Sequence, residues 1–183
     1  MDGIPRLVPW LLVAAFTVNS CGEEQKTSDA VPAAPGPLEL RMSFPSVDLV
    51  SVDGRAVNTK TLIQDRETIV FFVSLSCQSC EELIQTWTEL TEDIPAGLNL
   101  FAVTDEEAEF AGDFLQENPF PFPLYCDEKD TFGTRHQVNV FPTVVGTTSE
   151  GKIAFLGKAV TPLFTPKKAM SMFEEVKGAR EGS

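Results

Sequence analysis

Two cysteines separated by only two residues are the part of this sequence best suited to chemistry. Cys77 and Cys80 enclose Gln78 and Ser79. Thiols at this spacing can form and break a disulfide with each other, whereas closing so short a loop adds little to the stability of a fold. The same spacing supplies half of a tetrahedral zinc site. The pair therefore indicates either thiol–disulfide exchange or metal binding.

The residues around the pair predict a strand that leads into a helix. Residues 68–75 form an unbroken run rich in β-branched and aromatic residues, which is typical of a central strand covered on both faces. From Cys77 onward the apolar residues follow helical spacing until Pro95 and Gly97, and their stripe comprises Leu83, Ile84, Trp87, Leu90 and Ile94. The dithiol is thus expected at a strand-to-helix junction.

This junction makes Cys77 the predicted nucleophile and Cys80 the predicted resolving thiol. A thiol at a helix N-terminus meets unpaired N–H groups and the positive end of the helix dipole, which lower its pKa. Cys80 follows one turn later on the same face and can resolve a mixed disulfide formed at Cys77. Glu81 and Glu82 occupy the same turn and oppose a thiolate. The sign of the net shift in the pKa of Cys77 is therefore left open.

Other soft metal ligands are too few to favour zinc. A structural zinc site needs four ligands, and beyond the pair the predicted folded domain offers only Cys126 and the single His136. These two are far apart in the sequence and do not form a second close pair. The ligand count favours thiol–disulfide exchange over zinc, and no metal or cofactor site is predicted.

The remainder of the folded part alternates short apolar strands with helical segments. The predicted elements are strands around the Asp53–Gly54 turn, a helical turn at 59–63, a strand at 98–103, a helix at 105–116 whose Phe110, Phe114 and Leu115 face inward, a strand at 124–126, a helix at 127–137, strands at 143–147 and 152–156, and a helix at 166–177. Three prolines in 118–123 exclude a helix there. Its aromatic residues are interpreted as packing over the core, and a ligand surface is the alternative. A β-α-β-α alternation favours a largely parallel sheet.

The first twenty residues resemble a signal peptide. Arg6 precedes an apolar run at 7–18 that is too short to span a bilayer comfortably. The segment ends in Val-Asn-Ser before Cys21, which resembles the lipobox of bacterial lipoproteins, whose Cys is acylated and becomes the first mature residue. Cys21 is thus the predicted lipidation site. The alternatives are an ordinary signal peptide or an N-terminal helix that happens to carry a Cys.

Three segments follow from this pattern: a lipoprotein signal peptide at 1–20, a flexible Ala/Pro-rich tether at 21–38, and one folded domain at 39–183. The net charge is −13, and removing residues 1–20 leaves it unchanged because one acid and one base are lost together. Such an acidic chain argues against binding to nucleic acid and offers no basic patch for anionic lipid. Membrane attachment would depend on the acyl group.

A family resemblance rests on motifs that cover about residues 40–177. A strand, paired cysteines at a helix start, and Phe141-Pro142-Thr143 before a β-hairpin resemble the thioredoxin fold. The opening motif around Phe44 and the added helix and strand between Leu98 and Asp127 resemble the TlpA/ResA-like redoxins, which are membrane-anchored thioredoxins, and their peroxiredoxin relatives. This resemblance implies a thioredoxin-like α/β fold. Its central mixed sheet would be flanked by helices, with an N-terminal β extension and an inserted helix–strand unit.

The resemblance also implies a function and its residues. Cys77 and Cys80 would form the redox-active disulfide, Pro142 would be a cis-proline, and residues 141–143 would bind substrate. The implied protein is an extracytoplasmic, lipid-anchored thiol–disulfide oxidoreductase, facing the periplasm or the cell exterior, that reduces protein disulfides. It would take electrons from a membrane or periplasmic thiol donor and act as a monomer without a cofactor.

Several departures keep alternatives open. Ser76 stands where the family usually has Trp, and residues 68–75 include no acid, so a redox-inactive binding module with this fold is the main alternative. The peroxiredoxin order of Pro, Thr and Cys is absent before the pair, which disfavours a peroxidase. A copper chaperone that uses His136 is a minor alternative. By the family topology Cys126 lies two strands away, beyond the roughly 7 Å Cα limit for a disulfide, and is expected to be buried and inert.

Overall fold

A seven-stranded mixed sheet forms the centre of the fold. The strands lie in the order β2-β1-β5-β4-β3-β6-β7. Their bounds are Asp48–Ser51 for β1, Ala56–Asn58 for β2, Thr68–Phe72 for β3, Asn99–Thr104 for β4, Leu124–Cys126 for β5, Thr143–Thr147 for β6 and Ile153–Lys158 for β7. Only β3 with β4 and β4 with β5 pair in parallel. The largely parallel sheet expected from the alternation is wrong, because the β1–β2 and β6–β7 hairpins add antiparallel strands on both sides.

This computed structural model describes residues 36–181, which lie within one compact unit. The predicted signal peptide, the predicted lipidation site Cys21 and most of the predicted tether lie outside the described residues. Leu38, the last residue assigned to the tether, is buried in the core. Within the described part of the chain, no helix is both long enough and apolar enough to cross a membrane.

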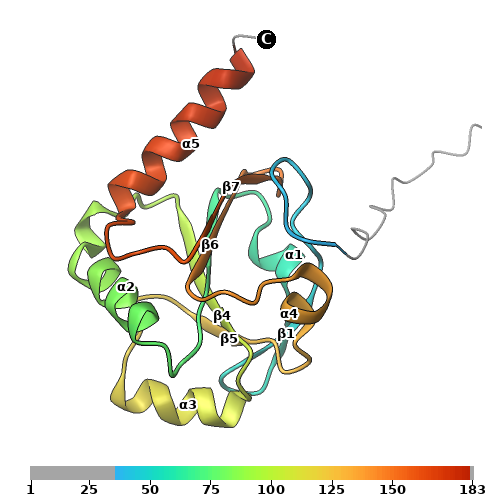
Figure 1. The fold of residues 1–183 in the computed structure, drawn as a ribbon, viewed down its shortest axis with the longest axis vertical. Helices are drawn as coiled ribbons and strands as arrows, with labels where there is room; N and C mark the ends of the chain where they lie inside the picture. Colours follow the sequence, from blue (N-terminus) through green and yellow to red (C-terminus); the bar gives the residue numbers. More distant parts are fainter. Residues whose placement is uncertain (1–35, 182–183) are drawn as a thin grey trace, which may run out of the picture. The chain divides into compact units, whose positions relative to one another are not determined.

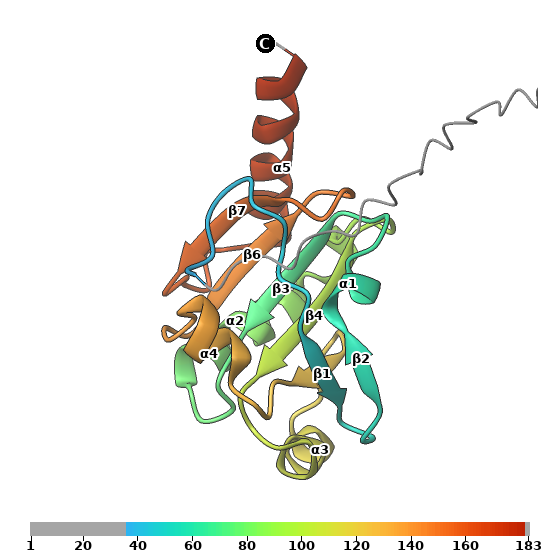
Figure 2. The same ribbon diagram turned by 90° about the vertical axis from the view of Figure 1, so that its right-hand side faces the viewer.

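The helices cover both faces of the sheet. They are α1 (Thr59–Leu62), α2 (Gln78–Glu89), α3 (Ala108–Glu117), α4 (Thr131–His136) and α5 (Pro166–Glu181), with a short 3-10 turn at Thr91–Asp93. Figure 1 shows α2 on one side of the sheet and α1 and α4 on the other. Figure 2 shows that α5 projects well beyond the rest of the fold. The predicted thioredoxin-like arrangement of a mixed sheet between helices is confirmed.

Two apolar cores follow from this layering, because strand residues alternate between the two faces. On the α2 side, the ring of Phe71 stacks on Phe122 and meets the Trp87 indole edge-on, each with ring centroids 4.9 Å apart. Trp87 is fully buried and donates a hydrogen bond from Nε1 to the carbonyl oxygen of Phe164 at 2.7 Å. On the α4 side, Phe72 meets Phe132. All residues of β3 are buried, as predicted for a central strand.

Two helices differ from their predicted form. Phe110 was expected to face inward but is 54% exposed, because the buried positions of α3 are the small residues Ala108 and Ala111. The predicted helix at 127–137 contains only the six residues of α4. Its first four predicted residues form a turn instead, in which a carboxylate oxygen of Asp127 accepts a hydrogen bond from the N–H of Phe132 at 2.7 Å.

Candidate active site

The paired cysteines lie at the predicted junction, directly before and within the first turn of α2. Cys77 is the N-cap of the helix with extended backbone angles, and Cys80 lies one turn later. The two are joined by a disulfide with their Cα atoms 5.2 Å apart. The sulfur of Cys77 also accepts a hydrogen bond from the N–H of Cys80 at 3.3 Å. A Cys side chain thus takes the capping position that usually carries an oxygen.

The two sulfurs differ in their access to solvent. Cys80 is 2% exposed and belongs to the core on the α2 side, whereas Cys77 is half-buried. The Oγ of Ser79 lies 3.3 Å from the sulfur of Cys77. An approaching thiol or disulfide therefore meets Cys77 first, with a hydroxyl and a helix N–H beside its sulfur. Thiolates accept such hydrogen bonds, which stabilise the charged form.

The Phe141-Pro142-Thr143 segment lies at the same end of the sheet. Phe72 at the end of β3 pairs with Thr143 at the start of β6, so this segment lies where the chain leaves β3 towards Cys77. The Phe141–Pro142 peptide bond is cis. Pro142 and Thr143 are buried, and the carbonyl oxygen of Pro142 accepts a hydrogen bond from the N–H of Val160 at 3.2 Å. Phe141 is the one residue of the three that keeps a half-exposed side chain.

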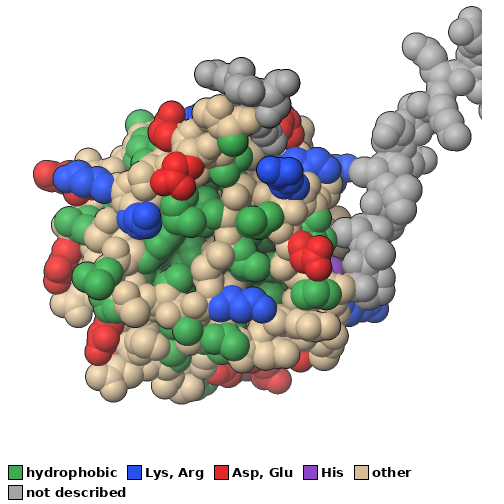
Figure 3. Space-filling model, turned by 45° about the horizontal axis from the view of Figure 1, so that its top comes forward, with side chains coloured by type: hydrophobic (Ala, Val, Ile, Leu, Met, Phe, Trp, Pro, Cys, Tyr) green, Lys and Arg blue, Asp and Glu red, His purple; other side chains and the backbone are tan. Residues whose placement is uncertain are grey.

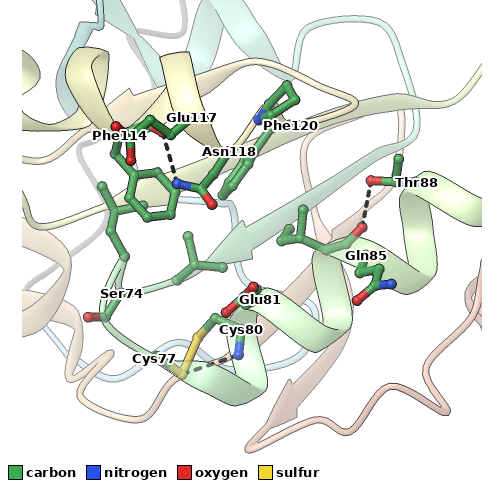
Figure 4. A pocket seen from close by; sticks show the side chains of 14 residues that line it. Ser74, Cys77, Cys80, Glu81, Gln85, Thr88, Phe114, Glu117, Asn118 and Phe120 are labelled. Carbon is green, nitrogen blue, oxygen red and sulfur yellow. Dashed lines mark hydrogen bonds between the residues drawn. A yellow bond between two sulfur atoms is a disulfide. The ribbon is translucent and has the colours of Figure 1, made fainter.

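A cleft of about 290 Å³ lies beside the disulfide. Figure 4 shows α2, with Cys80, Glu81, Gln85 and Thr88, on one side and α3 with the loop after it on the other. Its lining residues are Val73, Ser74, Leu75, Cys77, Cys80, Glu81, Ile84, Gln85, Thr88, Phe114, Glu117, Asn118, Pro119 and Phe120. None of residues 141–143 lines it. The cleft is therefore separate from the substrate-binding segment expected from the sequence.

The aromatic residues of 118–123 were expected to pack over the core, with a ligand surface as the alternative. Core packing is confirmed for Phe122, which is 8% exposed and stacks on Phe71. Phe120 is partly buried against the same core, and it also lines the cleft, with its ring 6.3 Å from that of Phe114. The two Pro-flanked phenylalanines look alike in the sequence, so no sequence signal separates them.

The charged groups at the cleft are both acidic. Glu81 at the start of α2 and Glu117 at the end of α3 line it, and no described lining residue is basic. Elsewhere the charges are mixed: on the face shown in Figure 3, acidic and basic side chains are scattered among exposed hydrophobic ones. The cleft thus combines apolar walls with a negative rim.

Cys126 and His136 lie apart from the disulfide. Cys126 is a fully buried free thiol at the end of β5, as predicted, and its burial, reinforced by the charges of Glu128 and Glu106, raises its pKa to about 11. His136 is 5% exposed in α4, with Nδ1 3.0 Å from the carbonyl oxygen of Gly36 and its ring against Phe132. Among residues 36–181, no group of three or more His, Cys, Asp or Glu side chains could hold a metal ion.

Comparison with known proteins places this chain in a family. Residues 41–155 match the AhpC/TSA family. The chain belongs to that family. The matched residues include the paired cysteines and the cis peptide bond. The resemblance that the sequence motifs suggested is thus confirmed at the level of family and fold.

Individual relatives agree with this assignment. A thioredoxin-like protein of Haemophilus influenzae is 25% identical over 115 residues, which cover 63% of this chain and 68% of that protein. The peroxidoxin BcpB of Mycobacterium tuberculosis has a similar structure, with a TM-score of 0.63, 12% identity, and coverage of 77% of this chain and 97% of that one. A putative thiol:disulfide interchange protein DsbE from Chlorobium tepidum gives 0.61 at 17% identity, with coverage of 76% and 98%. The structural likenesses extend the fold assignment across most of residues 36–181.

Proposed function

We propose that this AhpC/TSA-family chain is a lipid-anchored thiol–disulfide oxidoreductase that acts outside the cytoplasm and reduces disulfides in protein substrates. The observation that carries the proposal is the asymmetry of the Cys77–Cys80 disulfide at the start of α2. One sulfur is reachable and lies beside two hydrogen-bond donors, and the other is buried directly behind it. A nucleophile in front and a resolving thiol behind meet the requirements of two-step exchange.

The reaction follows from this arrangement. In the reduced protein the Cys77 thiolate attacks one sulfur of a substrate disulfide, forms a mixed disulfide, and expels the other substrate sulfur as a thiolate that takes a proton from water. Cys80, as a thiolate, then attacks the Cys77 sulfur and expels the second substrate thiolate. The substrate gains two electrons, and the protein is left with the internal disulfide seen here. A dithiol electron donor must then reduce that disulfide.

Membrane attachment is a separate part of the proposal and depends on Cys21. The support is the signal-like segment at 1–20 and its lipobox-like end. In cells that express the full chain, we expect the protein to partition into the detergent phase of a phase-separating detergent extract, and Cys21→Ser to move it to the aqueous phase. An aqueous wild-type protein would contradict the anchor and leave the redox proposal unaffected.

The redox proposal is tested by equilibrating the full chain in dithiothreitol or glutathione buffers of graded potential. Free thiols are then alkylated and assigned to each cysteine by mass, with Cys77→Ser and Cys80→Ser as controls. We expect one two-electron transition confined to Cys77 and Cys80. A midpoint near about −270 mV supports a reductant, and one near about −120 mV supports an oxidant. A pair that stays reduced under mild oxidants would instead indicate a binding module.

A further inference from the structure

The cleft beside the disulfide has a shape and a charge that suggest which substrates this site accepts. We propose that it binds one bulky apolar side chain close to the reacting cysteine of a protein substrate, and that basic residues in the same segment are favoured. This inference rests on the proposed function and names the class of substrate. It assigns a recognition site that lies apart from residues 141–143.

The walls of the cleft are apolar and come from separate elements. Leu75 precedes the disulfide, Ile84 lies one turn beyond Cys80, and the rings of Phe114 and Phe120 lie across from α2 (Figure 4). The floor includes Cys80 itself, so a side chain in the cleft lies next to the disulfide. A substrate residue held there would position the neighbouring substrate cysteine against Cys77.

The size of the cleft limits its occupant. A volume of about 290 Å³ lies just below the range for small-molecule sites, which is roughly 300–1,000 Å³. It suits one or two side chains of an extended segment and is small for a large cofactor. The rim is polar and exposed and includes Gln85, Thr88 and Asn118. Their side chains donate hydrogen bonds to a carboxylate oxygen of Glu89 and to the carbonyl oxygens of Ile84 and Phe114, so a peptide backbone would meet them as hydrogen-bond acceptors.

The charge of the cleft selects among possible partners. Glu81 and Glu117 are both exposed at its edge, and the chain as a whole carries a net charge of −13. Acidic partners are therefore repelled, including a second copy of this chain, whereas Lys or Arg next to the apolar anchor is attracted. The favoured occupant is thus a basic, apolar segment of a disulfide-bonded protein.

The test uses the full chain with dithiothreitol as electron donor and short disulfide-linked reporter peptides. One set places Phe at each of the three positions on either side of the Cys, beside Arg, and a matched set has Ala in place of Phe. We expect the best Phe peptide to exceed its Ala counterpart about tenfold in kcat/KM, as is usual for discrimination by an apolar pocket. If Phe is preferred over Ala by no more than twofold at every position, the proposal is overturned.

Variants assign the preference to the cleft. Phe120→Ala should reduce the preference for the Phe peptide over the Ala peptide to below about threefold. Phe110→Ala removes a ring of the same type from the exposed face of α3 and should retain the preference. Gln85→Trp, at an exposed helix position on the opposite wall, fills the cleft and should have the same effect as Phe120→Ala. An unchanged preference in the folded Gln85→Trp protein would place recognition elsewhere and overturn the proposal.

The charge is tested with Glu117→Gln, which leaves the residues of the disulfide untouched. At low salt we expect this variant to lower kcat/KM severalfold for Arg peptides, and added salt to remove the difference. Equal rates for peptides with Arg and with Glu would contradict the acidic rim. Hydroxyethyl disulfide, a small neutral substrate, separates the two proposals. If it is reduced while the peptides show no preference, only the cleft proposal fails; if neither is reduced, the proposed function fails.

Discussion

Cys77 and Cys126 are both placed by strands of the same sheet, β3 and β5, and yet their surroundings are opposite. β3 ends at Phe72 and a short loop leads to Cys77 at the start of α2, where the residue is half-buried and its sulfur accepts a hydrogen bond from a helix N–H. Cys126 is the last residue of β5 itself and is fully buried, and its pKa is raised to about 11. A thiol at a helix start and a thiol within a buried strand of the same sheet therefore differ in both access and acidity, which together control the reactivity of a cysteine.

Replacing each cysteine by alanine should give the largest difference in activity between the two positions. We expect Cys77→Ala to lower disulfide reduction by more than about a thousandfold, because the nucleophile is lost. Cys126→Ala should retain activity within about twofold. Both are measured as reduction of hydroxyethyl disulfide by the full chain. A large loss in Cys126→Ala, with an unchanged thermal midpoint, would show that the buried thiol takes part in the reaction.

The alkylation rates of Cys77 and Cys126 should also differ in the reduced wild-type protein. With a pKa of about 11, only about one Cys126 in a thousand is a thiolate at pH 8, and burial blocks the reagent as well. Iodoacetamide labelling read by mass at each cysteine should be at least a hundredfold faster at Cys77. In urea the two rates should converge. Similar rates in the folded protein would contradict the closed environment of Cys126.

The raised pKa of Cys126 also predicts a dependence of stability on pH. Its thiol ionises near the ordinary value of 9.0 in the unfolded chain and near about 11 in the folded one, so the folded state holds the extra proton between these values. The contribution of Cys126 to stability is complete below pH 9 and is lost as the pH rises towards 11. Urea unfolding of the oxidised protein should show a steeper alkaline loss in wild type than in Cys126→Ala. Parallel curves would contradict the shift.

The smallest effect is expected at Ser79, whose hydroxyl lies beside the Cys77 sulfur. Removing one hydrogen bond to a thiolate costs about 1 kcal/mol, so Ser79→Ala should slow alkylation of reduced Cys77 at pH 7 about threefold to fivefold. Ser76→Ala is the matched control, because the Ser76 hydroxyl pairs with that of Ser74 at 3.2 Å. If both variants slow alkylation equally, the Ser79 hydroxyl has no specific role.

Local patterns in the sequence were sufficient to place the disulfide. The run at 68–75 and the helical spacing after Cys77 depend only on neighbouring residues. The structure confirms the helix start and a buried strand over Thr68–Phe72, whereas residues 73–76 lie beyond the end of the strand and lead to Cys77. The direction of strand pairing was harder to predict from the sequence, because β6 pairs with β3 across about seventy residues of chain. The turn around Asp53 and Gly54 was predictable, since Gly54 takes a positive φ of 83° there.

The recognition cleft could not be predicted, because it depends on how two helices lie relative to each other. Phe114 and Phe120 lie across the cleft from α2 only after α3 packs on the sheet through its small residues Ala108 and Ala111. A helix that packs through alanines turns its larger side chains towards neighbours or solvent, which explains both the exposed Phe110 and the cleft-lining Phe114. Apolar spacing alone does not say which stripe of such a helix faces the core.

The contact between His136 and Gly36 sets how far the reactive end of the molecule could reach from a membrane. It secures the chain to α4 at Gly36, three positions before the predicted domain start, and leaves fifteen positions back to Cys21. With Cys21 held in a bilayer, that length of chain spans at most about 50 Å. The proposed reductase would then be limited to disulfides in proteins that come within one or two domain diameters of the membrane surface.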